Sequence, residues 1–108
     1  MVKKSIDNKT IMEIIQKYVE KICENYKVEA IILFGSYAKG TNNENSDIDI
    51  AIITDDFEND IIDEELNLMR LRRKIDTRIE PHLIRTKDYK NAVTPFIQEV
   101  IDTGIKVA

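Results

Sequence analysis

The chain is 108 residues long, a length that fits one domain, which we expect to span residues 1–108. Asp and Glu number 20 against 16 Lys and Arg, and the resulting net charge of −4 argues against general nucleic-acid binding, which usually needs a basic surplus. The sequence has neither an apolar leader nor a run of about 18 apolar residues, so we expect a cytoplasmic protein without a membrane-spanning helix.

The first element that the sequence predicts is a helix over residues 8–26, with Asp7 or Asn8 as its N-cap. Apolar side chains recur along it at helical spacing, and the only cysteine, Cys23, is expected to be a small core residue among them. A short apolar run over residues 29–34 follows and predicts a buried strand. The apolar face of the helix consists of Ile11, Ile14, Ile15, Tyr18, Val19, Ile22 and Cys23.

Residues 48–54 predict a second strand with apolar side chains on both faces, which favours a central position in the sheet. Residues 61–75 then predict a helix. Its last turns contain a basic cluster over residues 70–74, which suits the negative end of the helix dipole and which we interpret as a solvated face. The expected apolar side consists of Ile62, Leu66, Leu68, Met69, Leu71 and Ile75.

The last third of the chain predicts one more strand over residues 78–84, where Pro81 indicates an edge position or a bulge. Residues 87–91 form a polar segment. Pro95 can begin a helix, and residues 105–107 form a last short strand. This order predicts an α/β (α+β) domain with a small mixed β-sheet flanked by helices and covered mainly on one side.

The run from Leu33 to Gly40 contains the first chemical signal. An apolar strand leads to Gly35 and Ser36, where backbone N–H groups at a helix start can bind phosphate oxygens. Ser36 adds a hydroxyl, and Lys39 adds a positive charge one turn later. Gly-Ser alone also fits an ordinary turn, and its surroundings match neither a Walker motif nor a dinucleotide fingerprint.

Asp47 and Asp49 form the second signal. Side chains at positions i and i+2 of a strand point to the same face, so the two carboxylates can converge. Like charges on one face are unfavourable unless a cation lies between them, and Asp is rare inside strands. The pair therefore predicts a metal site. The alternative is that Asp47 closes the preceding loop and only Asp49 lies in the strand.

Gly35-Ser36, a spacer and the Ser-Asp-Ile-Asp of residues 46–49 together resemble the nucleotidyltransferase superfamily related to DNA polymerase β, and more closely its minimal nucleotidyltransferases. The resemblance covers most of the chain and implies a polymerase β-like nucleotidyltransferase fold. It also implies attack at the α-phosphate of ATP or another nucleoside triphosphate, with release of pyrophosphate. Gly35, Ser36, Lys39 and Ser46 are then expected to contact the triphosphate.

Members of that family use a third carboxylate on a neighbouring strand, and Asp76 and Glu80 are the candidates here. We favour Glu80 because it lies within the apolar strand, whereas Asp76 lies at the junction of helix and strand. Many relatives have Asp in this role, so Glu is a departure. The resemblance implies two Mg²⁺ ions, both held by Asp47 and Asp49, with Glu80 on the ion nearest the attacking hydroxyl. The alternative for Glu80 is a surface ion pair with a neighbouring basic side chain.

The resemblance further implies a partner protein, a separately encoded helical protein of HEPN type that is modified with AMP, which gives this chain an antitoxin role. Two alternatives stay open: a binding module that neutralises its partner by contact, and a small-molecule nucleotidyltransferase like those that modify aminoglycosides. A shallow site on so short a chain also suggests that a partner or a second copy completes it. His82, the only histidine, is interpreted as structural or solvated.

Overall fold

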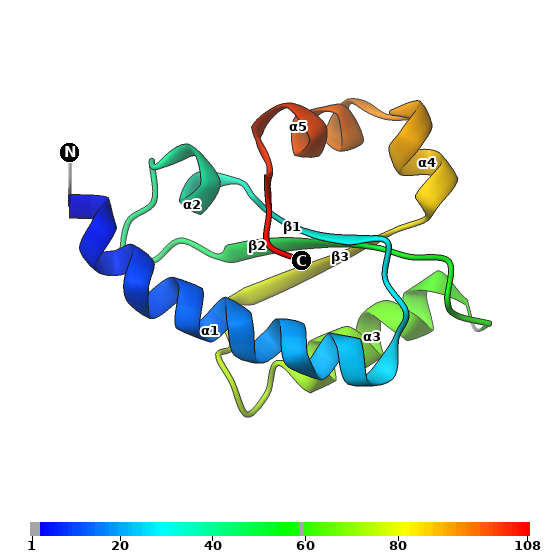
Figure 1. Ribbon diagram of the computed structural model, residues 1–108, viewed down its shortest axis with the longest axis horizontal. Coiled ribbons are helices and arrows are strands. Elements are labelled where there is room, and N and C mark those ends of the chain that lie inside the picture. The colour runs from blue at the N-terminus through cyan, green and yellow to red at the C-terminus, as the bar shows by residue number, and fades with distance from the viewer. Residues whose placement is uncertain (1–2, 59) are drawn as a thin grey trace.

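The computed structural model describes residues 3–58 and 60–108 and contains one mixed sheet flanked by helices (Figure 1). The strand order is β3-β2-β1-β4, in which β2 and β3 are parallel while β1 is antiparallel to both β2 and β4. The predicted α/β class is thus confirmed. The elements are α1 (Lys3–Asn25), β1 (Ala30–Phe34), α2 (Ser36–Lys39), β2 (Ile48–Ile53), α3 (Ile61–Leu71), β3 (Ile79–Ile84), α4 (Thr86–Asn91), α5 (Pro95–Thr103) and β4 (Ile105–Lys106).

Helices cover both faces of the sheet, with α1 and α3 on one side and α4 and α5 on the other (Figure 1). Side chains of β2 alternate between the two sides: Ile48, Ile50 and Ile52 join the larger cluster under α1 and α3, whereas Ala51 and Ile53 join the smaller cluster under α5. The expectation that mainly one face is covered is wrong, and the two-sided burial explains why β2 is apolar at every position except Asp49.

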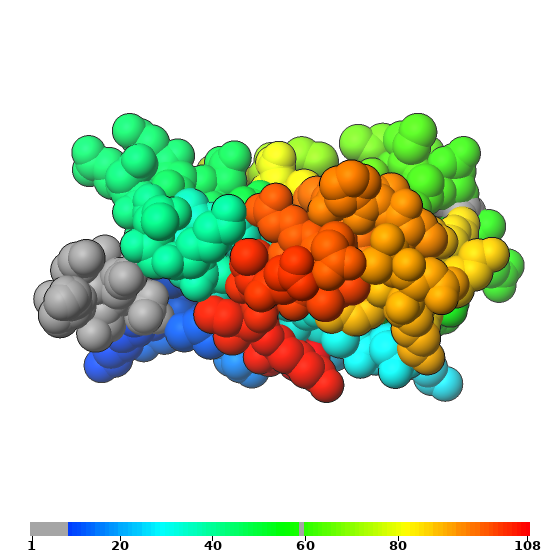
Figure 2. All heavy atoms as spheres, turned by 90° about the horizontal axis from the view of Figure 1, so that it is seen from above, coloured from blue at the N-terminus to red at the C-terminus, as the bar shows by residue number. Residues whose placement is uncertain are grey.

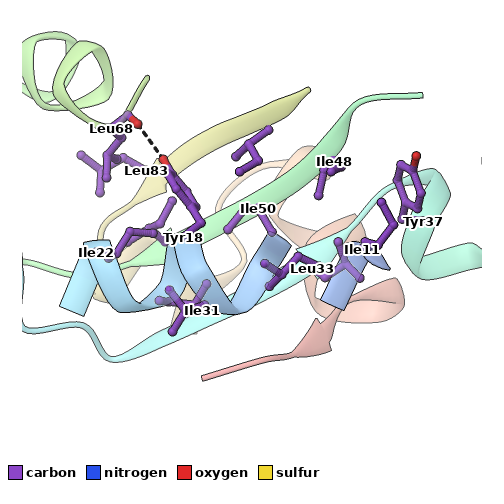
Figure 3. Packing of buried hydrophobic residues seen from close by; sticks show 14 of the residues in the cluster. Ile11, Tyr18, Ile22, Ile31, Leu33, Tyr37, Ile48, Ile50, Leu68 and Leu83 are labelled. Carbon is purple, nitrogen blue, oxygen red and sulfur yellow. Dashed lines mark hydrogen bonds between the residues drawn. The ribbon is translucent and has the colours of Figure 1, made fainter. Parts of the chain in front are cut away.

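Tyr18 links the two helices of the larger cluster (Figure 3). Its ring is fully buried, and its hydroxyl donates a 2.7 Å hydrogen bond to the carbonyl of Leu68 in α3. Burial raises the pKa of the Tyr18 hydroxyl well above its usual range. Because this carbonyl lies in the last turn of α3, the bond satisfies one of the acceptors that a helix leaves open at its end. The helix stops at Leu71, and tighter turns replace the expected extension to Ile75.

The strands agree with the sequence more closely than the helices do. β2 is central and β3, with Pro81, is at an edge, as predicted. The first helix begins at Lys3, so Asp7 and Asn8 lie inside it instead of capping it; no Gly or Pro precedes them to stop the helix. Cys23 is exposed and is therefore not a core residue.

Two helical segments differ from expectation. The polar segment near residue 87 forms α4, whose apolar contact comes from Tyr89 alone, too weak a pattern to be seen in the sequence. On α3 only Leu68 among the apolar residues is fully buried, while Ile62, Leu66 and Met69 face outward.

Among the described residues, no helix is both long and apolar enough to cross a membrane.

Candidate active site

Gly35 ends β1 in a conformation that side chains disfavour, with φ 78° and ψ −154°. A Cβ atom built at this residue would lie 2.3 Å from Oδ2 of Asp49. The absence of a side chain is therefore what allows the carboxylate of β2 to approach the backbone at the end of β1. This contact brings together the two halves of the motif that the sequence places fourteen positions apart.

Asp49 is flanked by paired residues on both sides, Phe34 on β1 and Glu80 on β3. Paired residues on neighbouring strands project to the same face, which here is the face covered by α4 and α5. Glu80 thus lies within β3, as the sequence predicted, and is adjacent to Asp49. Asp47 precedes the first residue of β2 and is exposed, so the strand itself contains only one of the two aspartates. That agrees with the alternative that Asp47 closes the loop.

Asp76, the other candidate for the third carboxylate, is paired with Arg78. The Arg78 guanidinium donates to both of its oxygens, with Nε 3.1 Å from Oδ1 and Nη2 2.9 Å from Oδ2, and the Arg78 backbone N–H donates to Oδ1 at 2.8 Å. These hydrogen bonds lower the pKa of Asp76 and raise that of Arg78. Asp76 therefore closes the turn before β3 and lies off the strand that carries Glu80.

The other residues expected to contact the triphosphate, Ser36, Ser46 and Lys39, have different surroundings. Ser36 is half-buried at the first position of α2, directly after Gly35. Ser46 accepts the backbone N–H of Asn43 at 2.9 Å and so shapes the loop before β2. Lys39 forms an ion pair with Glu99 of α5, its Nζ 3.3 Å from Oε2, with both side chains about half exposed. Such a pair is weakly held in water, so Lys39 can still exchange partners.

The chemistry of the donors fits Mg²⁺ if a phosphate ligand shares the ion. In the described part of the chain, no group of three or more His, Cys, Asp or Glu side chains is arranged to hold a metal ion by itself. Mg²⁺ is usually bound by one or two carboxylates together with water and substrate phosphates, so a complete protein cage is not needed. Asp47, Asp49 and Glu80 supply hard oxygen donors of this kind.

Sequence reasoning missed a cluster of aromatic rings beside Asp49. Nε2 of His82 lies 3.4 Å from Oδ1 of Asp49, and the His82 ring contacts both Phe34 and Phe96. His82 is half-buried and is not simply solvated. The available signal was its spacing, two residues after Glu80 on the same strand face.

The site is open to solvent. Figure 2 views the face that contains α4 and α5; α2 and α5 lie side by side, and yellow atoms of the β3 region reach the surface next to α5. Asp47 is exposed, and Asp49 and Glu80 are half-buried. A molecule approaching from outside can therefore reach the carboxylates.

Comparison with known proteins shows the family of the chain. The family model of the nucleotidyltransferase domain matches residues 15–107. MJ1379 of Methanocaldococcus jannaschii, named as a candidate protein adenylyltransferase, is 36% identical over 95 residues, which cover 88% of this chain and 91% of that protein. The protein adenylyltransferase MntA of Shewanella oneidensis is 36% identical over 78 residues, covering 72% of this chain and 52% of MntA, so the chain spans about half of MntA.

Solved structures share the fold. A candidate nucleotidyltransferase from Sulfolobus solfataricus superposes with a TM-score of 0.69 at 19% identity, over 98% of this chain and 87% of that one. A toxin–antitoxin complex with AMP-PNP gives a TM-score of 0.62 at 28% identity, over 90% and 72%. A variant of the MntA–HpeT toxin–antitoxin complex gives 0.58 at 26%, over 86% and 70%. With the family match over residues 15–107, these likenesses show that the chain belongs to the nucleotidyltransferase family of enzymes.

Proposed function

We propose that this chain, acting as a single domain, transfers AMP from ATP in the presence of Mg²⁺ to a hydroxyl group of a partner protein, a helical toxin of HEPN type, and so acts as its antitoxin. The observation that carries the proposal is the contact between Gly35 and Asp49, which joins the turn that we expect to bind phosphate to a carboxylate. The similarity to a toxin–antitoxin complex with AMP-PNP, at 28% identity, supports both the nucleotide and the kind of partner.

Different residues are proposed to contact the triphosphate and to hold Mg²⁺. The missing side chain of Gly35 lets the Asp49 carboxylate approach the turn, and the Ser36 hydroxyl can donate to a phosphate oxygen. Asp47, Asp49 and Glu80 would hold Mg²⁺, which neutralises phosphate charge and polarises the α-phosphate when bound. Lys39 can leave Glu99 for the triphosphate, because an exposed ion pair is readily exchanged.

The transfer step requires an acceptor oxygen in line with the leaving group. A new bond forms between this oxygen and the α-phosphorus, and the bond from the α-phosphorus to the bridging oxygen breaks, so that pyrophosphate leaves. The acceptor proton passes to Glu80, which is adjacent to Asp49 in the sheet, and then to water. Because the site is open, the acceptor hydroxyl is supplied by the partner.

A second candidate function is neutralisation by contact alone. The pairing of Lys39 with Glu99 favours it, because it engages the cation that is expected to contact the triphosphate. The two functions differ in whether the partner becomes covalently labelled.

The test is transfer of labelled AMP from ATP to the co-expressed partner, by wild type, Asp47→Asn/Asp49→Asn and Glu80→Gln. We expect the double variant to lose Mg²⁺-dependent ATP binding, measured by calorimetry, and Glu80→Gln to keep most ATP binding but to lose at least 100-fold in transfer rate, in the range of a lost general base. Asp76→Asn is the matched control and should retain transfer, because Asp76 is bound to Arg78.

Three outcomes would change the assignment. Equal Mg²⁺-ATP affinity in the double variant would show that the carboxylates are not the site. Loss of transfer in Asp76→Asn alone would move the third ligand by four residues. A wild-type chain that silences its partner without labelling it would replace transfer with contact.

A further inference from the structure

Three aromatic rings from separate elements meet beside Asp49. Phe34 of β1 and His82 of β3 lie with their ring centroids 5.1 Å apart, Phe96 of α5 is 5.3 Å from His82, and the two phenylalanines are 5.5 Å apart. The two contacts that involve Phe34 are edge-on, an arrangement that aromatic rings favour. The imidazole is therefore held on two sides and has little freedom to turn away from Asp49.

The Asp49 carboxylate is bounded at both of its oxygens. Oδ2 occupies the space left by the missing side chain of Gly35, and Oδ1 lies 3.4 Å from Nε2 of His82. The second distance is longer than the roughly 2.9 Å of an ideal N–H···O bond, and a small rotation of either side chain shortens it. The Asp49 side chain is only 25% exposed, so these two neighbours define much of its surroundings.

We propose that His82 is a positioning residue for Asp49: the clamped imidazole donates from Nε2 to Oδ1 and fixes the direction in which the carboxylate faces the ion and the triphosphate. This inference rests on the proposed function, because it concerns the same metal site. Carboxylates that bind metals are themselves commonly held by hydrogen bonds, and losing such a partner weakens metal binding about 10- to 100-fold. Nothing in this role requires His82 to touch the nucleotide.

Helix α5 extends the support to the other half of the site. Phe96 contacts His82 from the first turn of α5, and Glu99, one turn later, pairs with Lys39 of α2. The Thr94 hydroxyl accepts the backbone N–H of Ile97 and fixes the start of this helix. One short helix therefore contacts the residues that flank the Gly35 turn as well as those behind Asp49.

The test measures metal binding directly. Mn²⁺, a paramagnetic substitute for Mg²⁺, is titrated into the full chain with a non-hydrolysable ATP analogue, and free Mn²⁺ is followed by electron paramagnetic resonance. We expect His82→Ala to raise the Mn²⁺ dissociation constant about 10-fold or more. His82→Gln should restore most of the affinity, since its amide nitrogen reaches to about the place of Nε2 and can donate the same bond.

A second pair of variants tests the clamp without altering either bonding group. Phe96→Ala should weaken Mn²⁺ binding in the same direction as His82→Ala, by a smaller factor, because the imidazole is then free on one side. Ile101→Ala is the matched control: it lies on the same helix, with an exposure of 39% against 41% for Phe96, and lines a separate depression with Ala30 and Lys106. It should bind Mn²⁺ as wild type does. Thermal melts establish that each variant is folded.

The outcomes separate the two proposals. Wild-type affinity in His82→Ala overturns the positioning role, as does a His82→Gln variant as weak as His82→Ala. Equal losses of Mn²⁺ affinity in Phe96→Ala and Ile101→Ala would mean that the effect does not depend on the contact between Phe96 and His82. If the wild type shows no nucleotide-dependent Mn²⁺ binding, the proposed function itself fails.

Discussion

At the scale of single residues, Gly35 is important because it has no side chain. Its backbone conformation and its approach to Asp49 each exclude a side chain. The two restrictions have different causes, since one is local backbone strain and the other is a clash with a carboxylate on another strand. Gly40, at the other end of α2, also has a φ of 78°, with a ψ of 20°, and so provides a second glycine at positive φ for comparison.

We expect Gly35→Ala to reduce Mg²⁺-ATP affinity at least tenfold, because the added Cβ must displace the Asp49 carboxylate. The strained φ should also lower the free energy of unfolding by about 1 kcal/mol or more. Gly40→Ala serves as the control for backbone strain and should change ATP affinity little. Calorimetry and urea unfolding give the two quantities. Equal loss of affinity in both variants would mean that strain in α2, and not displacement of Asp49, is responsible.

Elements are held in place by polar groups placed within the apolar layers. At the end of α1 the Tyr26 hydroxyl donates to the buried Glu64 of α3 at 2.7 Å and accepts from Asn67 at 2.8 Å. Burial raises the pKa of Tyr26, and the hydrogen bond to Glu64 raises it further. With Tyr18 and Leu68, this gives α1 two fixed points on α3, which determine the register of one helix along the other.

Tyr18→Phe tests this anchoring. The variant keeps the ring but leaves the Leu68 carbonyl without its donor, which should reduce the free energy of unfolding by about 1 kcal/mol. Tyr89→Phe, on α4, is the matched control, because Tyr89 contributes its ring to the smaller apolar cluster. Urea unfolding of both variants is the measurement. A Tyr18→Phe variant as stable as Tyr89→Phe would contradict the role of the bond.

The sequence predicted the elements whose pattern is local and strong. Strands β1, β2 and β3 were found almost to the residue because β-branched runs end at Gly or polar residues. Helix α4 was missed because Tyr89 alone gives it an apolar contact. The pairing of His82 with Asp49, which lie 33 positions apart, could not be predicted, since spacing in the sequence does not determine which strands become neighbours.

At the scale of the whole molecule, the last strand closes the sheet. β4 pairs with β1, and the chain beyond it continues the pairing: Val107 donates to the Ile31 carbonyl at 2.8 Å, and Ile31 donates to the Ala108 carbonyl at 3.0 Å. These bonds cover the edge of an apolar strand that leads directly to Gly35. An uncovered edge of this kind pairs readily with other chains.

Removing residues 105–108 should therefore lower the free energy of unfolding by about 2 to 3 kcal/mol, from the few backbone bonds lost at about 1 kcal/mol each. It should also cause concentration-dependent self-association, measured by analytical ultracentrifugation. Lys106→Ala keeps the backbone pairing and should remain like wild type. A truncated chain that stays monomeric and equally stable would show that β4 is dispensable.

The two ends of the sheet contain different kinds of residues. The end of β1 and the starts of β2 and β3 meet at one end of the sheet, where Asp49 and Glu80 lie. The opposite end is built from other contacts, such as Thr54 donating to the Lys27 carbonyl and Asp55 accepting from Thr86. A fluorophore or a fused reporter joined at that end would lie at the opposite end of the sheet from Asp49 and Glu80, so the chain can be labelled or immobilised there without altering the proposed site.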